Sequence, residues 1–222
     1  GAATVVGTMA AAAKTGMPNG VFSMVHGASH EVGMQLVQHP LIKAVGFTGS
    51  FRGGKALFDL AVRRPEPIPV YAEMGSINPV FFLPRALQKN AAALAQAFAN
   101  AVTMGTGQFC TNPGLFVTLQ SDKSFANQIA ENLNNITVGA MLTSGIRQAF
   151  LNGIDHLKTQ EGITSLTAAP TEAVAPTLLL TTAARAIVEP DVTEEVFGPS
   201  TLGIIAEDKT SVLAFAKSLK GP

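Results

Sequence analysis

The side chains best suited to chemistry are a lone thiol and a carboxylate, which lie at the two ends of one stretch. Cys110 is the only cysteine of the 222 residues, and the irregular segment Gly105-Thr106-Gly107-Gln108-Phe109 precedes it. Glu73 ends a short apolar run, and a long Ala-rich segment with helical periodicity separates the two residues. A thiolate is a strong nucleophile, and a partly desolvated carboxylate takes a proton from a thiol or from water. We predict that Cys110 and Glu73 form a nucleophile and base pair.

Both residues also have a purely structural interpretation. A lone cysteine is more often a small buried hydrophobic side chain than a catalyst, and a carboxylate at a strand end often lies in solvent or in a salt bridge. The glycines near Gln108 favour the chemical interpretation of Cys110, because an irregular backbone after a long helix is costly if packing alone is needed. Backbone N–H groups in such a turn stabilise a thiolate and can hold an oxyanion.

Four scattered histidines leave a cysteine–histidine hydrolase open as an alternative. Their spacing does not exclude a partnership with Cys110, although each is typical of a surface or loop histidine. They are His26, His30, His39 and His156. No group of side chains has metal-ligand spacing, so the sequence predicts no metal site.

A glycine-rich turn joins a predicted strand, residues 42–48, to a predicted helix, residues 55–64. Its sequence, Gly49-Ser50-Phe51-Arg52-Gly53-Gly54-Lys55, places backbone N–H groups and the positive end of a helix where a phosphate can bind. The glycine and lysine spacing matches the start of a P-loop, but Ala56 stands where a P-loop has the hydroxyl that binds Mg²⁺. A dinucleotide pyrophosphate site and a plain strand-to-helix turn are the other two interpretations of this segment.

Apolar runs alternate with helical segments along the chain, a pattern typical of a parallel α/β sheet. The predicted strands are residues 21–25, 42–48, 70–73, 78–83, 115–119, 177–180 and 201–205. The predicted helices are residues 2–15, 31–38, 55–64, 86–104, 122–133, 143–157 and 208–219, whereas residues 159–176 carry few structural signals. We therefore predict an α/β fold with a boundary near residues 74–78, which separates a domain of residues 1–75 from one of residues 76–222.

Charge and composition exclude several kinds of partner. The 15 basic and 15 acidic residues give a net charge of zero without a long block of one sign, so neither a nucleic acid nor an anionic membrane is predicted. A single cysteine cannot form an intrachain disulfide, and the N-terminus lacks the features of a signal peptide. The uncharged stretch 90–121 is interrupted by amides, glycines and a proline, which argues against a membrane span. We expect a cytoplasmic protein.

The charged fraction of the chain is low. Only 14% of the residues are charged, whereas about 25% is typical of a soluble domain. A compact α/β protein with buried parallel strands would explain this composition, and so would a piece of a larger molecule whose contact faces are exposed.

Four motifs resemble those of the aldehyde dehydrogenases and follow the same order as in that family. They are Phe47-Thr48-Gly49-Ser50, similar to its cofactor-phosphate turn, Glu73-Met74-Gly75, similar to Glu-Leu-Gly, Gly107-Gln108-Phe109-Cys110, similar to Gly-Gln-x-Cys, and Glu195-Val196-Phe197-Gly198-Pro199, similar to Glu-x-Phe-Gly-Pro. The resemblance covers the whole chain. The longer forms Glu-Met-Gly-Ser-x-Asn-Pro and Gly-Gln-Phe-Cys-Thr-Asn-Pro-Gly are similar to the 2-oxoglutarate semialdehyde (2,5-dioxopentanoate) dehydrogenase branch, and long-chain aldehyde enzymes share some of them.

The resemblance implies oxidation of a small-molecule aldehyde through a covalent intermediate. Cys110 would attack the aldehyde carbon as a thiolate to give a thiohemiacetal, whose oxyanion would lie on the Cys110 N–H and an asparagine side chain. Hydride would pass to NAD⁺ or NADP⁺ and leave a thioester, and Glu73 would activate the water that releases the acid. This two-step route agrees with the nucleophile and base that the residues alone suggest.

The resemblance also implies which residues bind the cofactor. Gly49 and Ser50 would contact the pyrophosphate of NAD or NADP, and Thr48 would bind the cofactor as part of the same turn. Glu195 and Phe197 would hold the nicotinamide ribose and the nicotinamide ring. The implied fold is a three-layer αβα arrangement.

Proteins of the family are far longer than this chain, and two of their motifs are absent from its residues. These are the oxyanion asparagine and a ribose-binding lysine of the upstream cofactor domain. The resemblance therefore implies that residues 1–75 are the C-terminal half of a dinucleotide-binding domain and that residues 76–222 are a truncated catalytic domain. The full-length protein would be a homo-oligomer, a dimer or a tetramer. A non-catalytic fragment that retains the fold is the main alternative, followed by a P-loop-like NTPase and a cysteine hydrolase.

Overall fold

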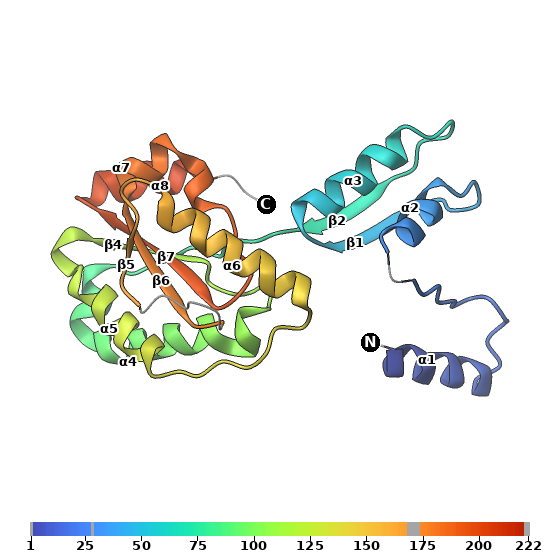
Figure 1. Ribbon diagram of the computed structural model, residues 1–222, viewed down its shortest axis with the longest axis horizontal. Coiled ribbons are helices and arrows are strands. Elements are labelled where there is room, and N and C mark those ends of the chain that lie inside the picture. The colour runs from blue at the N-terminus through green and yellow to red at the C-terminus, as the bar shows by residue number, and fades with distance from the viewer. Residues whose placement is uncertain (1, 28, 168–173, 220–222) are drawn as a thin grey trace. The chain divides into compact units, whose positions relative to one another are not determined.

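The computed structural model describes residues 2–27, 29–167 and 174–219 (Figure 1). Contacts divide the chain into two compact units, Gly1–Met74 and Gly75–Pro222, called unit 1 and unit 2 below. Each unit combines helices with its own β-sheet. None of the helices in the described part of the chain is long and apolar enough to cross a membrane.

Unit 1 contains a short parallel sheet and helices, and the helix between the two strands packs against the sheet. In chain order its elements are α1 (Ala2–Lys14), α2 (Glu31–Gln38), β1 (Val45–Gly49), α3 (Phe51–Val62) and β2 (Val70–Met74). Strands β1 and β2 pair in parallel from Val45 opposite Val70 to Gly49 opposite Met74. Few hydrophobic residues are buried in its core, and among the described residues they are Val37, Ala61 and Ile68.

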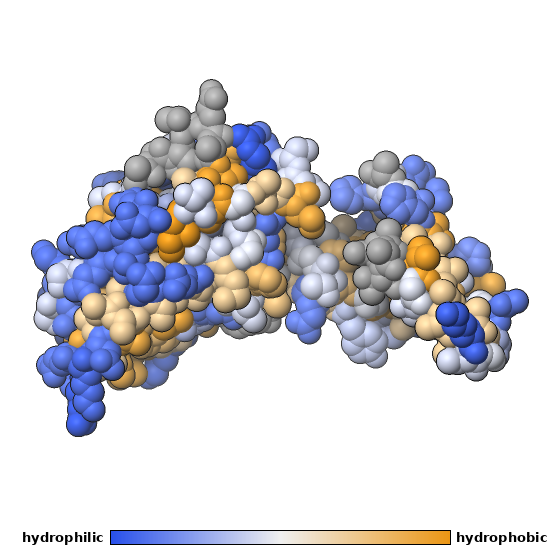
Figure 2. All heavy atoms as spheres, turned by 90° about the horizontal axis from the view of Figure 1, so that it is seen from below, coloured by the Kyte–Doolittle hydropathy of each residue, from blue (hydrophilic) through white to orange (hydrophobic). Residues whose placement is uncertain are grey.

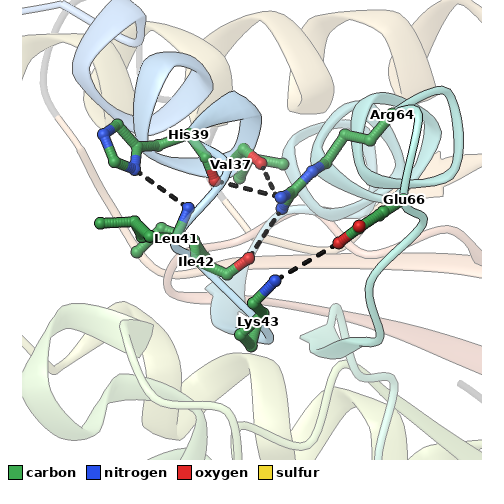
Figure 3. A network of polar contacts seen from close by, with 7 residues as sticks. All are labelled: Val37, His39, Leu41, Ile42, Lys43, Arg64 and Glu66. Carbon is green, nitrogen blue, oxygen red and sulfur yellow. Dashed lines mark hydrogen bonds and ion pairs between the residues drawn. The ribbon is translucent and has the colours of Figure 1, made fainter.

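Arg64 joins α2 to the end of α3 through a buried guanidinium (Figure 3). The residue is only 8% exposed. Its Nη1 donates to the carbonyls of Val37 and Ile42 at 2.9 and 3.0 Å, and its Nη2 donates to the carbonyl of His39 at 3.1 Å. The last carbonyls of a helix lack partners inside the helix and carry partial negative charge, so a cation satisfies them well. Arg64 therefore stabilises the end of α2 and the loop that follows it.

We expect Arg64→Met to lower the free energy of unfolding of unit 1 by about 2–3 kcal/mol, because hydrogen bonds from a charged donor are lost and three carbonyls lose a partner. Arg64→Lys should recover only part of this loss, since an ammonium cannot reproduce the planar fork. The measurement is urea denaturation followed by circular dichroism. Arg63→Met, at the exposed neighbouring position, is the control, and an equal loss in both variants would contradict the assignment.

Unit 2 is built on a five-stranded sheet with the order β3-β4-β7-β6-β5. Its strands are β3 (Val80–Phe81), β4 (Leu115–Leu119), β5 (Thr164–Ser165), β6 (Thr177–Thr182) and β7 (Ser200–Ala206). Its α-helices are α4 (Pro84–Thr103), α5 (Ser124–Asn134), α6 (Ser144–Thr159), α7 (Ala183–Val188) and α8 (Lys209–Ser218), with 3₁₀ turns at Met104–Gly107, Gln120–Asp122 and Pro190–Thr193. All neighbouring strands are parallel except the antiparallel pair β5–β6 at one edge.

Helices cover both faces of the unit 2 sheet, so its strands are apolar on both sides. Figure 1 shows α4 and α5 on one side of the sheet and α7 and α8 on the other. The first core contains four phenylalanines in edge-to-face contact, namely Phe82, Phe98, Phe116 and Phe125. The second core contains Leu115 and Val117 of the same strand β4, together with Ile204 and Phe215. Buried parallel strands are expected to be hydrophobic on both faces, and the predicted three-layer αβα fold is confirmed.

The predicted helices form within four residues of their expected ends, but one predicted strand is wrong. Residues 21–25 form no strand, and Val21 and Val25 are each 62% exposed. A strand needs a neighbour for its backbone hydrogen bonds, and β1 pairs only with β2 in the described part of unit 1. Strand β3 is shorter than predicted because Asn78 has a left-handed backbone and Pro84 already begins α4.

Unit 1 exposes many large hydrophobic side chains. They include Val21, Phe22, Met24, Val25, Met34, Leu41, Phe51, Phe58, Val62 and Tyr71. Figure 2 shows orange, hydrophobic residues reaching the surface among the blue, hydrophilic ones. These side chains account for part of the low charged fraction, and exposed apolar surface of this kind is typical of interaction faces.

Candidate active site

Three loops of unit 2 meet at one edge of its sheet. Residues 75–79 precede β3, Cys110 precedes β4, and residues 195–199 precede β7. Because β3, β4 and β7 are neighbours and parallel, their amino ends lie together. The backbone hydrogen bonding between these strands continues into the loops. The Gly114 N–H donates to the Ile77 carbonyl at 2.8 Å, and the Leu202 N–H donates to the Gly114 carbonyl at 2.9 Å.

Cys110 is exposed, and its own backbone carbonyl is held by two side chains. The Ser76 Oγ donates to this carbonyl at 2.5 Å and the Asn78 Nδ2 donates to it at 2.7 Å. Asn78 adopts a φ of +45°, a left-handed conformation that asparagine tolerates better than most residues. The segment before β3 thus fixes the backbone of Cys110 while the residue stays accessible, as a nucleophile requires.

The turn before Cys110 has three successive residues with a left-handed backbone. Gly105, Thr106 and Gly107 have φ values of +56°, +60° and +67°. A non-glycine residue in this region costs on the order of 1–3 kcal/mol, so buried Thr106 stores strain beside the thiol. At Gly107 a Cβ atom would lie 2.2 Å from the carbonyl carbon and oxygen of Gly198, so only glycine allows the two loops to cross. The predicted irregular backbone is therefore required by a contact with the 195–199 loop.

Glu195 lies against the segment that precedes β3. Its Oε2 accepts a hydrogen bond from the Ser76 N–H at 3.2 Å and is 3.1 Å from the position of a Cβ on Gly75. Desolvation raises the pKa of Glu195 from its ordinary value of 4.5, and the bond from the Ser76 N–H partly offsets this rise. Phe197 is 38% exposed on the same loop, and a Cβ on the following Gly198 would lie 2.3 Å from the Phe150 ring.

The raised pKa of Glu195 predicts a pH-dependent effect on stability. A carboxyl whose pKa is higher in the folded state contributes most below its unfolded pKa, and that contribution is lost as the pH rises through the folded pKa. We therefore expect Glu195→Gln to raise the melting temperature at pH 7, with a difference that shrinks as the pH falls through the raised folded-state pKa and is smallest below 4.5. Calorimetry of both proteins across this range is the measurement. A wild-type advantage that grows with pH would contradict the prediction.

The other predicted site residues lie in unit 1. Thr48 and Gly49 end β1, and Ser50 is the N-cap of α3, where its Oγ accepts a hydrogen bond from the Gly53 N–H at 3.2 Å. Glu73 lies in β2, directly opposite Thr48 in the strand register. All four residues are exposed at the carboxyl ends of parallel strands, the edge at which α/β sheets bind ligands. Glu73 and Cys110 belong to different units, so their pairing as base and nucleophile stays a prediction.

Two alternatives gain no support from the geometry. Lys55 Nζ lies 2.6 Å from the Asp59 carboxylate on the next turn of α3, whereas a P-loop lysine binds phosphate. His156 is the only histidine of unit 2, and its Nε2 contacts Gln160 at 3.4 Å. No histidine hydrogen-bonds to Cys110 among the described residues, and these residues include no group of three or more side chains that could hold a metal ion.

Three polar residues of the site have no role in the sequence prediction, namely Ser76, Asn78 and Asn112. Their only signal is their position inside the two longer motifs that contain Glu73 and Cys110. Asn112 is 9% exposed, and its Nδ2 donates to the carbonyls of Val102, Gly107 and Gly198. These residues build the backbone frame around the thiol.

The motifs, the three-layer αβα fold and the exposed thiol at the amino ends of its strands define the class of protein. A sequence profile described as the aldehyde dehydrogenase family matches residues 1–218, and the chain belongs to this family.

Within this family, the chain is similar to two alpha-ketoglutaric semialdehyde dehydrogenases. The chain is 44% identical over 218 residues to alpha-ketoglutaric semialdehyde dehydrogenase 2 of Azospirillum brasilense, with 96% of this chain and 42% of the relative covered. It is 37% identical to alpha-ketoglutaric semialdehyde dehydrogenase of Acinetobacter baylyi, with 93% of this chain and 40% of the relative covered. The chain thus spans less than half the length of these curated relatives, and the predicted resemblance to the family and to this branch is confirmed.

Solved structures share the fold. A NAD-dependent benzaldehyde dehydrogenase from Corynebacterium glutamicum superposes with a TM-score of 0.78 at 26% identity, covering 94% of this chain and 46% of its own. A betaine aldehyde dehydrogenase from Staphylococcus aureus gives a TM-score of 0.81 at 20% identity, covering 97% and 45%. At that identity the second match supports the fold alone.

Proposed function

We propose that the chain is part of an enzyme that oxidises 2-oxoglutarate semialdehyde to the dicarboxylate with NAD or NADP. One observation carries this proposal: the exposed thiol of Cys110 lies on a strained, backbone-fixed turn that crosses the loop of Glu195 and Phe197. Family membership and the two semialdehyde dehydrogenase relatives support the substrate class. The whole reaction is proposed for the complete enzyme, since this chain spans less than half of those relatives.

Cys110 is the proposed nucleophile. Its thiolate attacks the aldehyde carbon, a C–S bond forms, and the carbonyl oxygen becomes the oxyanion of a thiohemiacetal. The backbone N–H of Cys110 is the donor that this chain offers to the oxyanion, and the bonds from Ser76 and Asn78 to the carbonyl of the same residue hold the adjoining peptide unit. Loss of hydride from the former aldehyde carbon leaves a thioester on Cys110. Glu73 is the proposed base that takes a proton from the water that hydrolyses the thioester.

The residues present fit a dinucleotide at two places. The exposed turn Thr48, Gly49 and Ser50 lies at the N-terminus of the 12-residue helix α3, which favours a phosphate group. The carboxylate of Glu195 suits ribose hydroxyls, and the exposed ring of Phe197 suits packing against a flat heterocycle. NAD or NADP, when bound, supplies the hydride acceptor.

The organisation of the complete enzyme follows from the same proposal. Residues 1–75 form the C-terminal half of the dinucleotide-binding domain, and residues 76–222 form part of the catalytic domain. The complete enzyme is a cytoplasmic homo-oligomer, a dimer or a tetramer, with no nucleic acid or membrane partner.

The test is an assay of the complete enzyme with 2-oxoglutarate semialdehyde and either NAD⁺ or NADP⁺, in which absorbance of the reduced nicotinamide is measured. We expect turnover with this substrate and a lower kcat/KM with an uncharged aldehyde of the same length. Failure to reduce either cofactor with any aldehyde would exclude the function. Hydrolysis of ATP with Mg²⁺ in place of aldehyde oxidation would favour the NTPase, although the Lys55–Asp59 pair argues against it.

A non-catalytic role of the chain on its own is the second candidate. The observation that favours it is the coverage of 42% and 40% of the two relatives. Equilibrium dialysis of the 222-residue chain against NAD⁺ and NADP⁺ distinguishes the two cases, because a chain that is catalytic by itself must bind one of them.

A further inference from the structure

The side-chain amide of Asn112 connects three backbone segments around the thiol. Its Nδ2 shares its two hydrogens among three carbonyls, those of Val102 in α4 at 3.2 Å, of Gly107 in the turn before Cys110 at 3.0 Å, and of Gly198 at 3.0 Å. The last of these bonds spans 86 positions of the sequence. It is a side-chain hydrogen bond between the loop of the thiol and the loop of Glu195 and Phe197.

The backbone of Asn112 is fixed as well. Its N–H donates to the Phe109 carbonyl at 3.0 Å, and its carbonyl accepts from the Asn78 Nδ2 at 3.0 Å. The residue is 9% exposed, so its amide is withdrawn from competition with water. A buried amide with these bonds keeps a defined geometry, because its movement would leave the bonded carbonyls without a hydrogen-bond partner.

The acceptor half of the same amide faces a different environment. Asn112 Oδ1 and Thr201 Oγ1 are buried and have no hydrogen-bond partner among the described residues. Both residues line one cavity of about 30 Å³, together with Glu195 and Gly198. A cavity of this size, with two unpaired oxygens in its lining, has room for about one water molecule. The contribution of the Asn112 side chain to holding the loops together therefore comes from its donor atom Nδ2.

We propose that Asn112 is a positioning residue, which sets the distance between the loop of Cys110 and the loop of Glu195 and Phe197. This inference rests on the proposed function, in which the carbon bound to Cys110 loses hydride to a ring held near Phe197. The glycines alone do not fix that distance. They permit the close crossing of residues 107 and 198, whereas the amide supplies the attraction across it. A misplacement of about 1 Å between reacting groups lowers a rate by about 10²-fold.

The first test measures the coupling of the two loops without any activity. Hydrogen–deuterium exchange is followed in the 222-residue chain for the peptides of residues 105–112 and 196–200. In Asn112→Ala we expect both peptides to exchange about tenfold faster, since one side chain holds both loops. Leu133→Ala removes a fully buried core side chain of α5 and serves as the stability-matched control. It should not accelerate these two peptides selectively.

The second test measures catalysis in the complete enzyme. We expect kcat of Asn112→Ala to fall about 10²-fold, and kcat of Leu133→Ala to stay within about twofold at a temperature where both proteins are folded. Asn112→Ser keeps a hydroxyl donor and is the second variant if the alanine protein does not fold. In the serine variant, hydrogen–deuterium exchange of the two peptides should speed up by a smaller factor than in the alanine variant.

The outcomes separate the two proposals. Acceleration of only one peptide, of neither, or of both to the same degree in Leu133→Ala would overturn the positioning role. If both peptides of the 222-residue Asn112→Ala chain exchange faster while the complete wild-type enzyme oxidises no aldehyde, the coupling of the loops is supported and the proposed function is rejected. Joint acceleration with an unchanged kcat would show that the distance set by Asn112 is not used in catalysis, and would also overturn the proposal.

Discussion

The complete enzyme with Cys110→Ser should lose aldehyde oxidation by a factor on the order of 10⁴ or more, because the covalent step has no replacement nucleophile. A serine hydroxyl ionises far less readily than a thiol, so the alkoxide needed for attack is scarce at neutral pH. The fold should be unaffected, since Cys110 is exposed and the hydrogen bonds at this position go to its backbone carbonyl. The measurement is kcat/KM with 2-oxoglutarate semialdehyde.

The single thiol of the 222-residue chain provides a direct control for this variant. Iodoacetamide should add one equivalent to the wild-type chain and none to the serine variant, as counted by intact-mass spectrometry. Thermal unfolding of the two chains should coincide. Retention of more than a few per cent of the activity in the complete enzyme would reject Cys110 as the nucleophile.

Gly107→Ala should be the most damaging single-methyl substitution near the thiol. Its φ of +67° already disfavours alanine by about 1–2 kcal/mol. The new Cβ would also lie 2.2 Å from backbone atoms of Gly198, which cannot rotate away as a flexible side chain could. We expect the free energy of unfolding to fall by about 3 kcal/mol or more, because strain and overpacking add at this position.

The matched control for this substitution is Gly145→Ala in the first turn of α6. A Cβ there meets nothing closer than the Thr143 Oγ1 at 3.9 Å. Alanine should be neutral or should stabilise by up to about 1 kcal/mol, as helix propensity predicts. Urea denaturation of both variants is the measurement. Similar midpoints for Gly107→Ala and Gly145→Ala would mean that the two loops do not approach as closely as described.

Reactive residue types in short motifs could be recognised from the sequence, whereas their supports could not. Cys110 was predicted because a lone thiol in a glycine-rich segment is local information, and Glu195 because it belongs to a short motif that resembles one of a known family. Asn112 was not, because its role depends on a carbonyl 86 positions away. Asn78 was likewise predicted to be a strand residue, but its side chain donates a hydrogen bond to the Cys110 carbonyl, 32 positions away.

The same distinction applies to the fold. The helices and long buried strands of unit 2 follow from periodicity and from unbroken apolar runs, so β4 has its predicted bounds. The apolar run of residues 21–25 has the same local character, but a strand also needs a neighbour, and no local pattern reports one. The short elements α7 and β5 contain too few residues to show a period.

Because β3, β4 and β7 are parallel, the loops that precede these strands and the loops that follow them lie at opposite ends of the unit 2 sheet. The thiol turn, the segment of Ser76 and the loop of Glu195 all lie before β4, β3 and β7. The loops that follow the strands, such as residues 207–208 between β7 and α8, touch none of these groups in the contacts described. Insertions, deletions and fused segments can therefore accumulate during evolution in the loops that follow the strands, while the chemistry in the loops that precede them stays unchanged.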